Sequence, residues 1–230
     1  MNLKLGAAIG ILVLSMSAQT NNSKPSEVEI TAEPSHHLVL QNPYVRVFQV
    51  EVAPRSATLM HRHRHDYMFV TLGPAEVLNE VEGKAPVSLK LQDGETRFVH
   101  GNFAHIARNP TDAPFRNVTI ELLKESEKTW TDDRGLHVLH GGTEDVVFVK
   151  DGVRVSEIEL QIAGVLPKHH HTGPELLVAV SDLLLRNDVV GKPASNLEMK
   201  SGEVKWLTGG LTHTATNVGT QAAKFVTLEF

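Results

Sequence analysis

The chain has 230 residues, a formal net charge of −5 and 41% hydrophobic residues. This composition is typical of a globular protein and argues against disorder throughout. The negative charge and the lack of a Lys/Arg cluster argue against nucleic acid as a partner. Cysteine is absent, which excludes disulfides, zinc–thiolate sites and a thiol nucleophile. The 13 histidines stand out in a chain with only 5% aromatic residues and require an explanation.

The first 18 residues have the pattern of an export signal. Lys4 precedes the apolar run Leu5–Leu14, and small residues follow at Ser15, Ser17 and Ala18. The run is shorter than the roughly 20 residues that a membrane-spanning helix needs. We therefore expect residues 1–18 to be a signal peptide, removed on export to the periplasm or the extracellular space, with no membrane attachment afterwards. Residues 19–36 are polar and predict a flexible leader.

A repeat with a spacing of 108 positions organises the rest of the chain. It pairs His61-x-His63 with His169-x-His171, and His105-x-x-x-Asn109 with His213-x-x-x-Asn217. Further matches fall at the same spacing without a gap, which chance does not supply. The repeat predicts one domain over 37–123 and a second over 146–230. The charged, glycine-containing segment 124–145 between them predicts a linker.

Each copy has the pattern of an all-β domain. Val45–Val52 and Val153–Ile162 are rich in β-branched residues, and Tyr67–Leu72 and Leu176–Val180 are apolar runs of strand length. Gly, Pro, Asn and Asp separate the runs at short intervals, which is typical of a small barrel or jelly roll. About 85 residues per copy is small for an independent core, so we expect the two barrels to pack on each other.

The second copy holds a complete set of candidate metal ligands. His169, His171 and Glu175 are all odd-numbered, so in an extended strand they can point into one lumen. His213 follows about 40 residues later and has to come from another strand. Three imidazoles and one carboxylate suit first-row divalent metals, here Mn, Fe, Ni, Cu or Zn.

These residues also resemble the two motifs of the cupin superfamily. The second copy reads Gly164-x4-His169-x-His171-x3-Glu175 and then Gly202-x5-Thr208-x-Gly210-x2-His213-x3-Asn217. The departures are one residue fewer after the first glycine, Asp182 at the closing glycine and Thr208 in place of proline, none at a ligand position. The resemblance implies two tandem cupin-type jelly-roll barrels, with His169, His171, Glu175 and His213 as metal ligands.

The first copy fits the motifs less completely. His61, His63 and His105 occupy three ligand positions, but Tyr67 stands where the family has glutamate. A three-histidine set still binds a metal in principle, and Tyr67 is a further ligand candidate or a neighbour of the ligands. A basic surface strand over residues 61–65 is the alternative.

Several other residues receive plainer interpretations. His36 and His37 are expected to end the leader, with a ligand role as the lesser alternative. Arg46 and Arg154 recur at the repeat spacing, and an outward strand position explains them as well as a role in the site does.

The resemblance does not fix a reaction, because cupins host enzymes and non-enzymatic binders on one scaffold. The apolar strand after Glu175 favours a small apolar or aromatic ligand, and a dioxygenase-type oxidoreductase is the first hypothesis. A non-catalytic cupin that binds metal or a small ligand is the second, and a barrel that metal only stabilises is the third. No catalytic residue beyond the ligands is assigned, and a homo-oligomer stays open.

Overall fold

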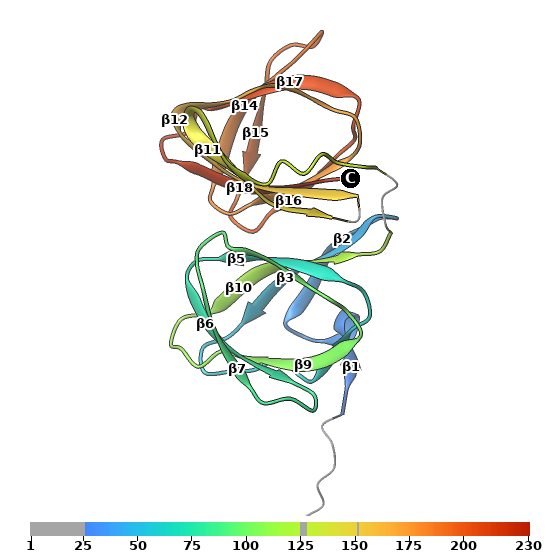
Figure 1. The fold of residues 1–230 in the computed structure, drawn as a ribbon. Coiled ribbons are helices and arrows are strands. Elements are labelled where there is room, and N and C mark those ends of the chain that lie inside the picture. The colour runs from blue at the N-terminus through green and yellow to red at the C-terminus, as the bar shows by residue number, and fades with distance from the viewer. Residues whose placement is uncertain (1–25, 125–127, 151) are drawn as a thin grey trace, which may run out of the picture.

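The computed structural model describes residues 26–124, 128–150 and 152–230, so the predicted signal peptide lies outside the described residues. The chain folds into two β-barrels stacked one on the other (Figure 1). Within the described ranges, the one helical element is a 3-10 turn, η1 (Ile30–Ala32), and no helix there is long and apolar enough to cross a membrane. The predicted all-β fold of two barrels is therefore confirmed.

The first barrel is made of two five-stranded sheets, ordered β1-β4-β9-β6-β7 and β2-β3-β10-β5-β8. Its strands are β1 (Val28–Glu29), β2 (His36–Gln41), β3 (Val45–Val52), β4 (His61–His63), β5 (Tyr67–Leu72), β6 (Ala75–Val81), β7 (Val87–Leu91), β8 (Thr96–Val99), β9 (Phe103–Arg108) and β10 (Phe115–Leu122).

The second barrel is one curved sheet ordered β15-β14-β17-β12-β18-β13-β16, with β11 added beside β12. Its strands are β11 (Gly135–Lys150), β12 (Val153–His171), β13 (Glu175–Ala179), β14 (Leu183–Val189), β15 (Ser195–Met199), β16 (Val204–Leu207), β17 (Leu211–Asn217) and β18 (Ala223–Glu229). The long β12 pairs with β18 along its first half and with β17 along its second, and it shifts register between Leu166 and His169.

The structure reproduces the sequence repeat strand by strand. Strands β5 to β10 correspond to β13 to β18 at the repeat spacing, and β3 with β4 corresponds to the continuous β12. The asparagine that follows each distal histidine makes the same bonds in both copies. Asn109 donates to the carbonyls of Val52, Ala53 and Ala113, and Asn217 does the same 108 positions later. Both asparagines therefore fix a turn, as side-chain amides commonly do.

The barrels begin earlier than the predicted boundaries. Strand β1 and η1 lie in the segment predicted as a flexible leader, and β1 pairs with β4. Ile30 is 2% exposed and packs in the first barrel's core, which explains why this part is ordered. Likewise, β11 starts at Gly135 inside the predicted linker and pairs with β12. Burial of an apolar residue and pairing with a neighbouring strand therefore order a segment even where its local composition is polar.

The two barrels share one apolar core. In β3, Val45 and Val47 face the other barrel while Phe48 and Val50 face the lumen, as the two-residue period of a strand requires. Fifteen buried residues form the cluster between the barrels: thirteen come from β3, β5, β10, β12, β13 and β18, and the other two are Val180 and Phe230 beside them. Because this cluster draws on both copies, neither barrel buries its outer sheet alone.

Polar contacts reinforce this interface symmetrically. The side chain of Gln49 donates to the carbonyl of Gly202, and the backbone N–H of Thr96 donates to the Glu157 carboxylate, each at 2.9 Å. Gly202 has φ +87° and lies 3.1 Å from Leu72 of the other barrel, measured from an ideal Cβ, so a side chain at this position meets both strain and crowding. The interface is therefore specified by turns as well as by apolar packing.

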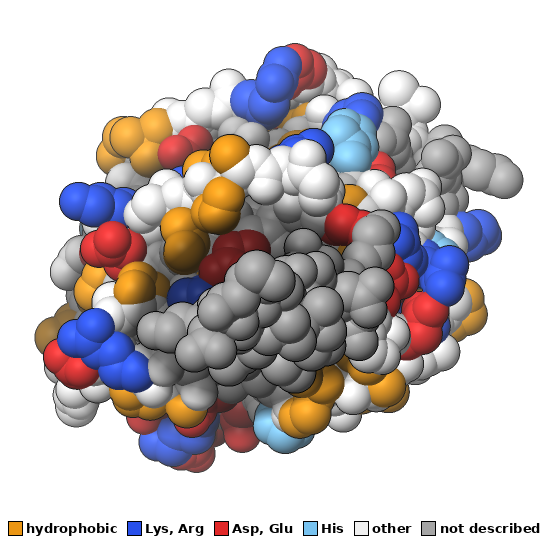
Figure 2. Space-filling model, turned by 90° about the horizontal axis from the view of Figure 1, so that it is seen from below, with side chains coloured by type: hydrophobic (Ala, Val, Ile, Leu, Met, Phe, Trp, Pro, Cys, Tyr) orange, Lys and Arg blue, Asp and Glu red, His pale blue; other side chains and the backbone are white. Residues whose placement is uncertain are grey.

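The end of the molecule at the first barrel carries charges of both signs. Figure 2 shows basic and acidic side chains interspersed on the part of this face that is not grey. Among the described residues, Arg62 pairs with Glu27 and Arg64 pairs with Glu29. Glu27 precedes β1 and Glu29 belongs to it. These ion pairs attach β1 to β4 and so hold the barrel's first strand in place.

Leu176→Ala should destabilise the whole chain, because Leu176 is fully buried between the barrels. We expect a loss of about 2–5 kcal/mol in the free energy of unfolding, measured by urea denaturation. Val190→Ala, at a residue 60% exposed, should change it by less than about 0.5 kcal/mol. Equal effects of the two substitutions would show that the cluster does not bind the barrels together.

Glu157→Gln should stabilise the metal-free protein at neutral pH. Burial raises the pKa of Glu157, and Asp145 and Glu95 act in the same direction. The fold therefore disfavours the charged carboxylate. The protonated group contributes fully to the free energy of unfolding below the ordinary pKa of glutamate, and this contribution is lost as pH rises through the raised pKa of Glu157. A glutamine at this position still accepts the hydrogen bond from the backbone N–H of Thr96, and it carries no charge to destabilise the fold at neutral pH. The melting temperature of the variant should exceed that of the parent at pH 7, and the difference should vanish near pH 4.

Candidate metal centres

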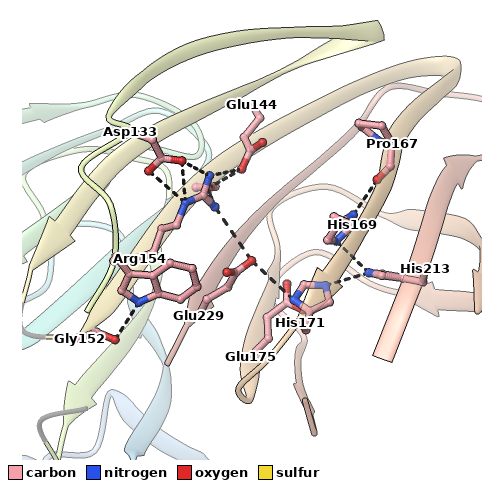
Figure 3. A network of polar contacts seen from close by, with 12 residues as sticks. Asp133, Glu144, Gly152, Arg154, Pro167, His169, His171, Glu175, His213 and Glu229 are labelled. Atoms are coloured by element: carbon pink, nitrogen blue, oxygen red, sulfur yellow. Dashed lines mark hydrogen bonds and ion pairs between the residues drawn. The ribbon is translucent and has the colours of Figure 1, made fainter. Parts of the chain in front are cut away.

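The second barrel brings three of its four predicted ligands to one point. His169 and His171 project from the same face of β12, and His213 on β17 lies directly opposite His169 in the antiparallel pair. The Nε2 atom of His213 is 3.0 Å from that of His169 and 2.9 Å from that of His171 (Figure 3). These three residues form a group with ligand atoms within 4.8 Å of one another.

Hydrogen bonds on the far side of each ring fix which nitrogen carries the proton. The Nδ1 of His169 lies 2.7 Å from the carbonyl oxygen of Pro167, and that of His213 lies 2.6 Å from Oδ1 of Asn187. Oxygens of this kind only accept, so each Nδ1 is the donor and each Nε2 keeps its lone pair. The Nδ1 of His171 faces two carboxylates, Glu175 at 3.4 Å and Glu229 at 3.6 Å.

Three imidazole lone pairs thus converge without a proton between them. Burial lowers the pKa of His171 to about 3 and that of His213 to about 4, with His169 lowering both further. The rings of His171 and His213 are therefore neutral near pH 7, and the converging lone pairs repel one another unless a cation lies among them. This donor set fits a divalent metal ion held by His169, His171 and His213.

Glu175 lies beside the group rather than in it. It is 5% exposed at the start of β13, and its carboxylate is next to Nδ1 of His171, on the side away from the converging nitrogens. Burial and the neighbouring Glu229 raise the pKa of Glu175 to about 8. A cation at the triad would favour its charged form. Its role as a direct ligand stays a prediction; as placed, it orients His171.

Arg154 lies over the mouth of this barrel and does not point outward. It donates to Glu144 at 3.0 Å and to Asp133 at 3.1 Å, and it lies 4.0 Å from Glu229 (Figure 3). Asp133 and the adjacent Trp130 come from the predicted linker, which therefore closes one side of the site. A cavity of about 390 Å³ opens here, with four carboxylates and Arg154 in its lining, so this approach to the metal group is polar.

The first barrel repeats the arrangement with its own three histidines. His61 and His63 lie on β4, and His105 on β9 pairs directly with His61. The Nε2 atoms of His63 and His105 are 3.2 Å apart. The Nδ1 of His61 meets the carbonyl of Leu59 at 2.9 Å, and that of His105 meets Oδ1 of Asn79 at 2.6 Å, which copies the bonds of the second barrel.

These rings are also neutral and incompletely partnered. Burial lowers the pKa of His61 to about 4 and that of His105 to about 3, and it places the pKa of His63 well below its usual range. Nε2 of His61 and Nδ1 of His63 are buried without a hydrogen-bond partner. A buried nitrogen without a partner is costly, and a metal bound to Nε2 of His61 satisfies the lone pair of that atom. The donor set of the first barrel therefore also fits a metal ion.

Tyr67 stacks on the site instead of reaching into it. Its ring lies parallel to that of His63, with centroids 4.0 Å apart and an interplanar angle of 17°. Burial raises the pKa of Tyr67 above its ordinary value, so the phenol stays neutral. It packs against His63 at the position where Glu175 accompanies His171 in the other copy.

Two residues of the predicted leader join the first site. His36 on β2 belongs to a group with His61 and His63 whose ligand atoms lie within 4.8 Å of one another. Its Nδ1 is 2.6 Å from the carboxylate of Glu33, which also accepts from the backbone of Ser35 and Leu59. No motif marks these residues; the apolar Val28 and Ile30 just before them are the signal that this segment is ordered.

The two barrels differ most in the space beside the histidines. In the first barrel a cavity of about 300 Å³ adjoins the site, and most of its lining is apolar, including Val50, Phe69, Val77, Leu89 and Phe115. In the second, the internal apolar cavity against His169 and His213 measures about 110 Å³. Room for an apolar molecule therefore lies beside the less complete motif.

No protein-family model matches the chain, and no curated protein sequence matches it. Solved structures match in fold. AerE from Microcystis aeruginosa aligns with a TM-score of 0.56 and 14% identity over 85% of this chain and 97% of that one. Oxalate decarboxylase from Bacillus subtilis aligns with a TM-score of 0.61 and 10% identity, over 81% of this chain and 68% of that one. A cupin 2 conserved barrel domain protein from Leptotrichia buccalis aligns with a TM-score of 0.53 and 12% identity, over 84% of this chain and 87% of that one. Identities this low show the fold alone.

Asn187→Ala should weaken metal binding in the second barrel by about 10–100-fold, because it removes the acceptor that fixes the proton on Nδ1 of His213. Zinc competition with a chromophoric chelator, in a His105→Ala background that disables the first site, measures this affinity. Asn187→Asp keeps a side-chain oxygen that accepts from Nδ1 of His213, so this variant should retain the metal affinity of the parent. Parent-like affinity in Asn187→Ala would contradict the assigned role.

Proposed function

Because the chain has the cupin fold in its two-barrel form, with a metal-binding histidine group in each barrel, we propose that it is an exported, metal-dependent oxidoreductase of the dioxygenase type. Its substrate is a small apolar or aromatic molecule, and the substrate binds in the first barrel. One observation carries this proposal: the apolar cavity of about 300 Å³ that adjoins His61, His63 and His105. That volume suits a small organic ligand, and apolar walls with a few polar groups are typical of such sites.

The cavity lining argues against a small dianion as substrate. Arg97 is the one basic side chain, other than histidine, that lines the cavity, and it is already paired with Glu95 at 2.6 Å. A dicarboxylate in this space would leave charge buried without a partner, which costs free energy. The structurally similar oxalate decarboxylase acts on such a dianion by its name, but the likeness in fold does not carry that substrate to this chain.

The protein's own residues bind and orient the substrate. The apolar walls exclude water and pack against a ring or alkyl group. Thr119 and Asn117, both buried in the cavity wall, are joined by a hydrogen bond of 2.8 Å in which the threonine donates. The threonine oxygen keeps an acceptor lone pair, so it accepts a hydrogen bond from a substrate hydroxyl. A phenol or enol placed this way presents its polar end beside the histidines.

A metal ion held by the histidines supplies the redox and Lewis-acid chemistry that joins dioxygen to an electron-rich substrate. The overall change balances without a further reductant. The O–O bond and one carbon–carbon bond of the substrate break, and both oxygen atoms end in the product. The substrate is oxidised and dioxygen is reduced, one molecule of each per turnover.

Export belongs to this proposal and is supported by the pattern of residues 1–18, with a positive Lys4 ahead of the apolar Leu5–Leu14. Outside the cytoplasm a chain without cysteine avoids thiol oxidation, which is consistent with contact with dioxygen.

Oxygen uptake by protein reconstituted separately with Mn, Fe, Ni, Cu or Zn, in the presence of a panel of phenols and enols, tests the reaction. Uptake that depends on the metal and on one phenol or enol, with one oxygen consumed per substrate, is the expected result. Leu89→Trp should fill the cavity and lower turnover at least tenfold while metal content is unchanged.

Leu197→Trp is the matched control, because Leu197 is the counterpart of Leu89 in the second barrel. It should leave turnover unchanged, and melting curves of both variants separate loss of function from the strain of overpacking. No oxygen uptake with any metal, alongside saturable binding of phenols, would replace the enzyme with a non-catalytic ligand-binding cupin.

A further inference from the structure

His36 enters the first barrel from outside the repeat of histidines. It lies at the start of β2, where it pairs with Val50 of β3. Its side chain is 5% exposed, and its ring centroid is 4.7 Å from that of His61 and 6.4 Å from that of His63. A buried imidazole this close to two others, with a ligand atom within 4.8 Å of theirs, adds a fourth nitrogen donor to the site.

Glu33 fixes His36 in the form that a metal requires. Its carboxylate lies 2.6 Å from Nδ1 of His36, and its own side chain is 2% exposed. Backbone N–H groups of Ser35 and Leu59 donate to the same carboxylate at 2.8 and 3.1 Å. A carboxylate held by three donors fixes Nδ1 of His36 as a donor, so Nε2 is the nitrogen that a metal can bind, as in carboxylate–histidine–metal arrangements.

The other barrel shows that this histidine is particular to the first copy. Glu144 pairs with Ile158 at the position corresponding to that of His36 opposite Val50, and it binds Arg154 instead. The first barrel therefore has imidazole at this position and a phenol at Tyr67, where the second has carboxylates at both. Compared with the second barrel, the first has a phenol in place of one carboxylate and an imidazole in place of the other. Both differences change the donors around the histidines of the first barrel.

We propose that His36 is the fourth ligand of a four-imidazole metal site in the first barrel, with His61, His63 and His105, and that Glu33 positions it. Such a site has no charged ligand in contact with the ion, so it suits ions that bind imidazole well, such as Co, Ni, Cu or Zn. The proposal rests on the metal site of the first barrel but not on the reaction, because metal binding is measured without substrate.

Cobalt(II) alone is the probe, since its visible absorption reports the number and kind of its ligands. The purified full-length protein carries His169→Ala and His213→Ala, which disable the second site. His36→Ala and His36→Gln are added to this background, and His37→Ala is the matched control because His37 is the exposed neighbour on the same strand. Glu33→Gln tests positioning and Tyr67→Phe tests the alternative ligand.

The background protein should bind one cobalt ion, and both His36 variants should weaken binding at least tenfold and change the visible spectrum. Glu33→Gln should weaken it less and keep the spectral shape, while His37→Ala and Tyr67→Phe should match the background. Melting curves of the metal-free proteins identify folding defects, and the glutamine variant carries the test if the alanine variant does not fold. Unchanged affinity and spectrum in a folded His36 variant, or no cobalt bound by the background protein, would overturn the proposal.

Discussion

An imidazole nitrogen binds a metal only when the other nitrogen of the ring keeps the proton, and both barrels are arranged around this requirement. Each distal histidine donates from Nδ1 to an asparagine, and each first histidine of the His-x-His pair donates to a backbone carbonyl two residues earlier. Antiparallel pairing then places the distal ring opposite that first histidine. The lone pairs converge because strand register, hydrogen bonds and burial all act in the same direction.

The two barrels share this arrangement of histidines but differ in the residues that surround it. The second barrel surrounds its triad with carboxylates and Arg154, and its approach is polar. The first combines uncharged histidines with a larger apolar cavity. The shared apolar core couples the two barrels, since each covers an outer sheet of the other that would otherwise be exposed. The difference between a polar site and an apolar site follows from a few side chains at equivalent positions of the repeat.

Much of this was predictable from the sequence, because the repeat places equivalent residues at equivalent strand positions. The strands Val45–Val52 and Tyr67–Leu72 match those predicted. The triad of the second barrel follows from the two-residue period together with the distal His213, and the same reasoning brings His105 to His61 and His63. A ligand role for His36 was only the lesser alternative in the sequence. It depends on the pairing of β2 with β3 and on a carboxylate three residues earlier, and no motif marks either of them. Local polarity suggested a leader, whereas Ile30 anchors the segment in the core.

The direction of Glu175 also lay beyond sequence reasoning. Its odd number places it on the lumen side of the strand, but its carboxylate lies 3.4 Å from Nδ1 of His171 rather than among the converging nitrogens. The size of the two cavities depends in the same way on packing at many positions, which no motif records.

Elemental analysis of the purified, metal-supplemented protein at neutral pH tests the central claim most directly, because it counts the ions that the converging histidines hold. The account predicts two ions per chain, with one lost in His213→Ala and the other lost in His105→Ala. A chain that retains no metal would contradict it, since the unprotonated nitrogens would then have to meet without a cation between them.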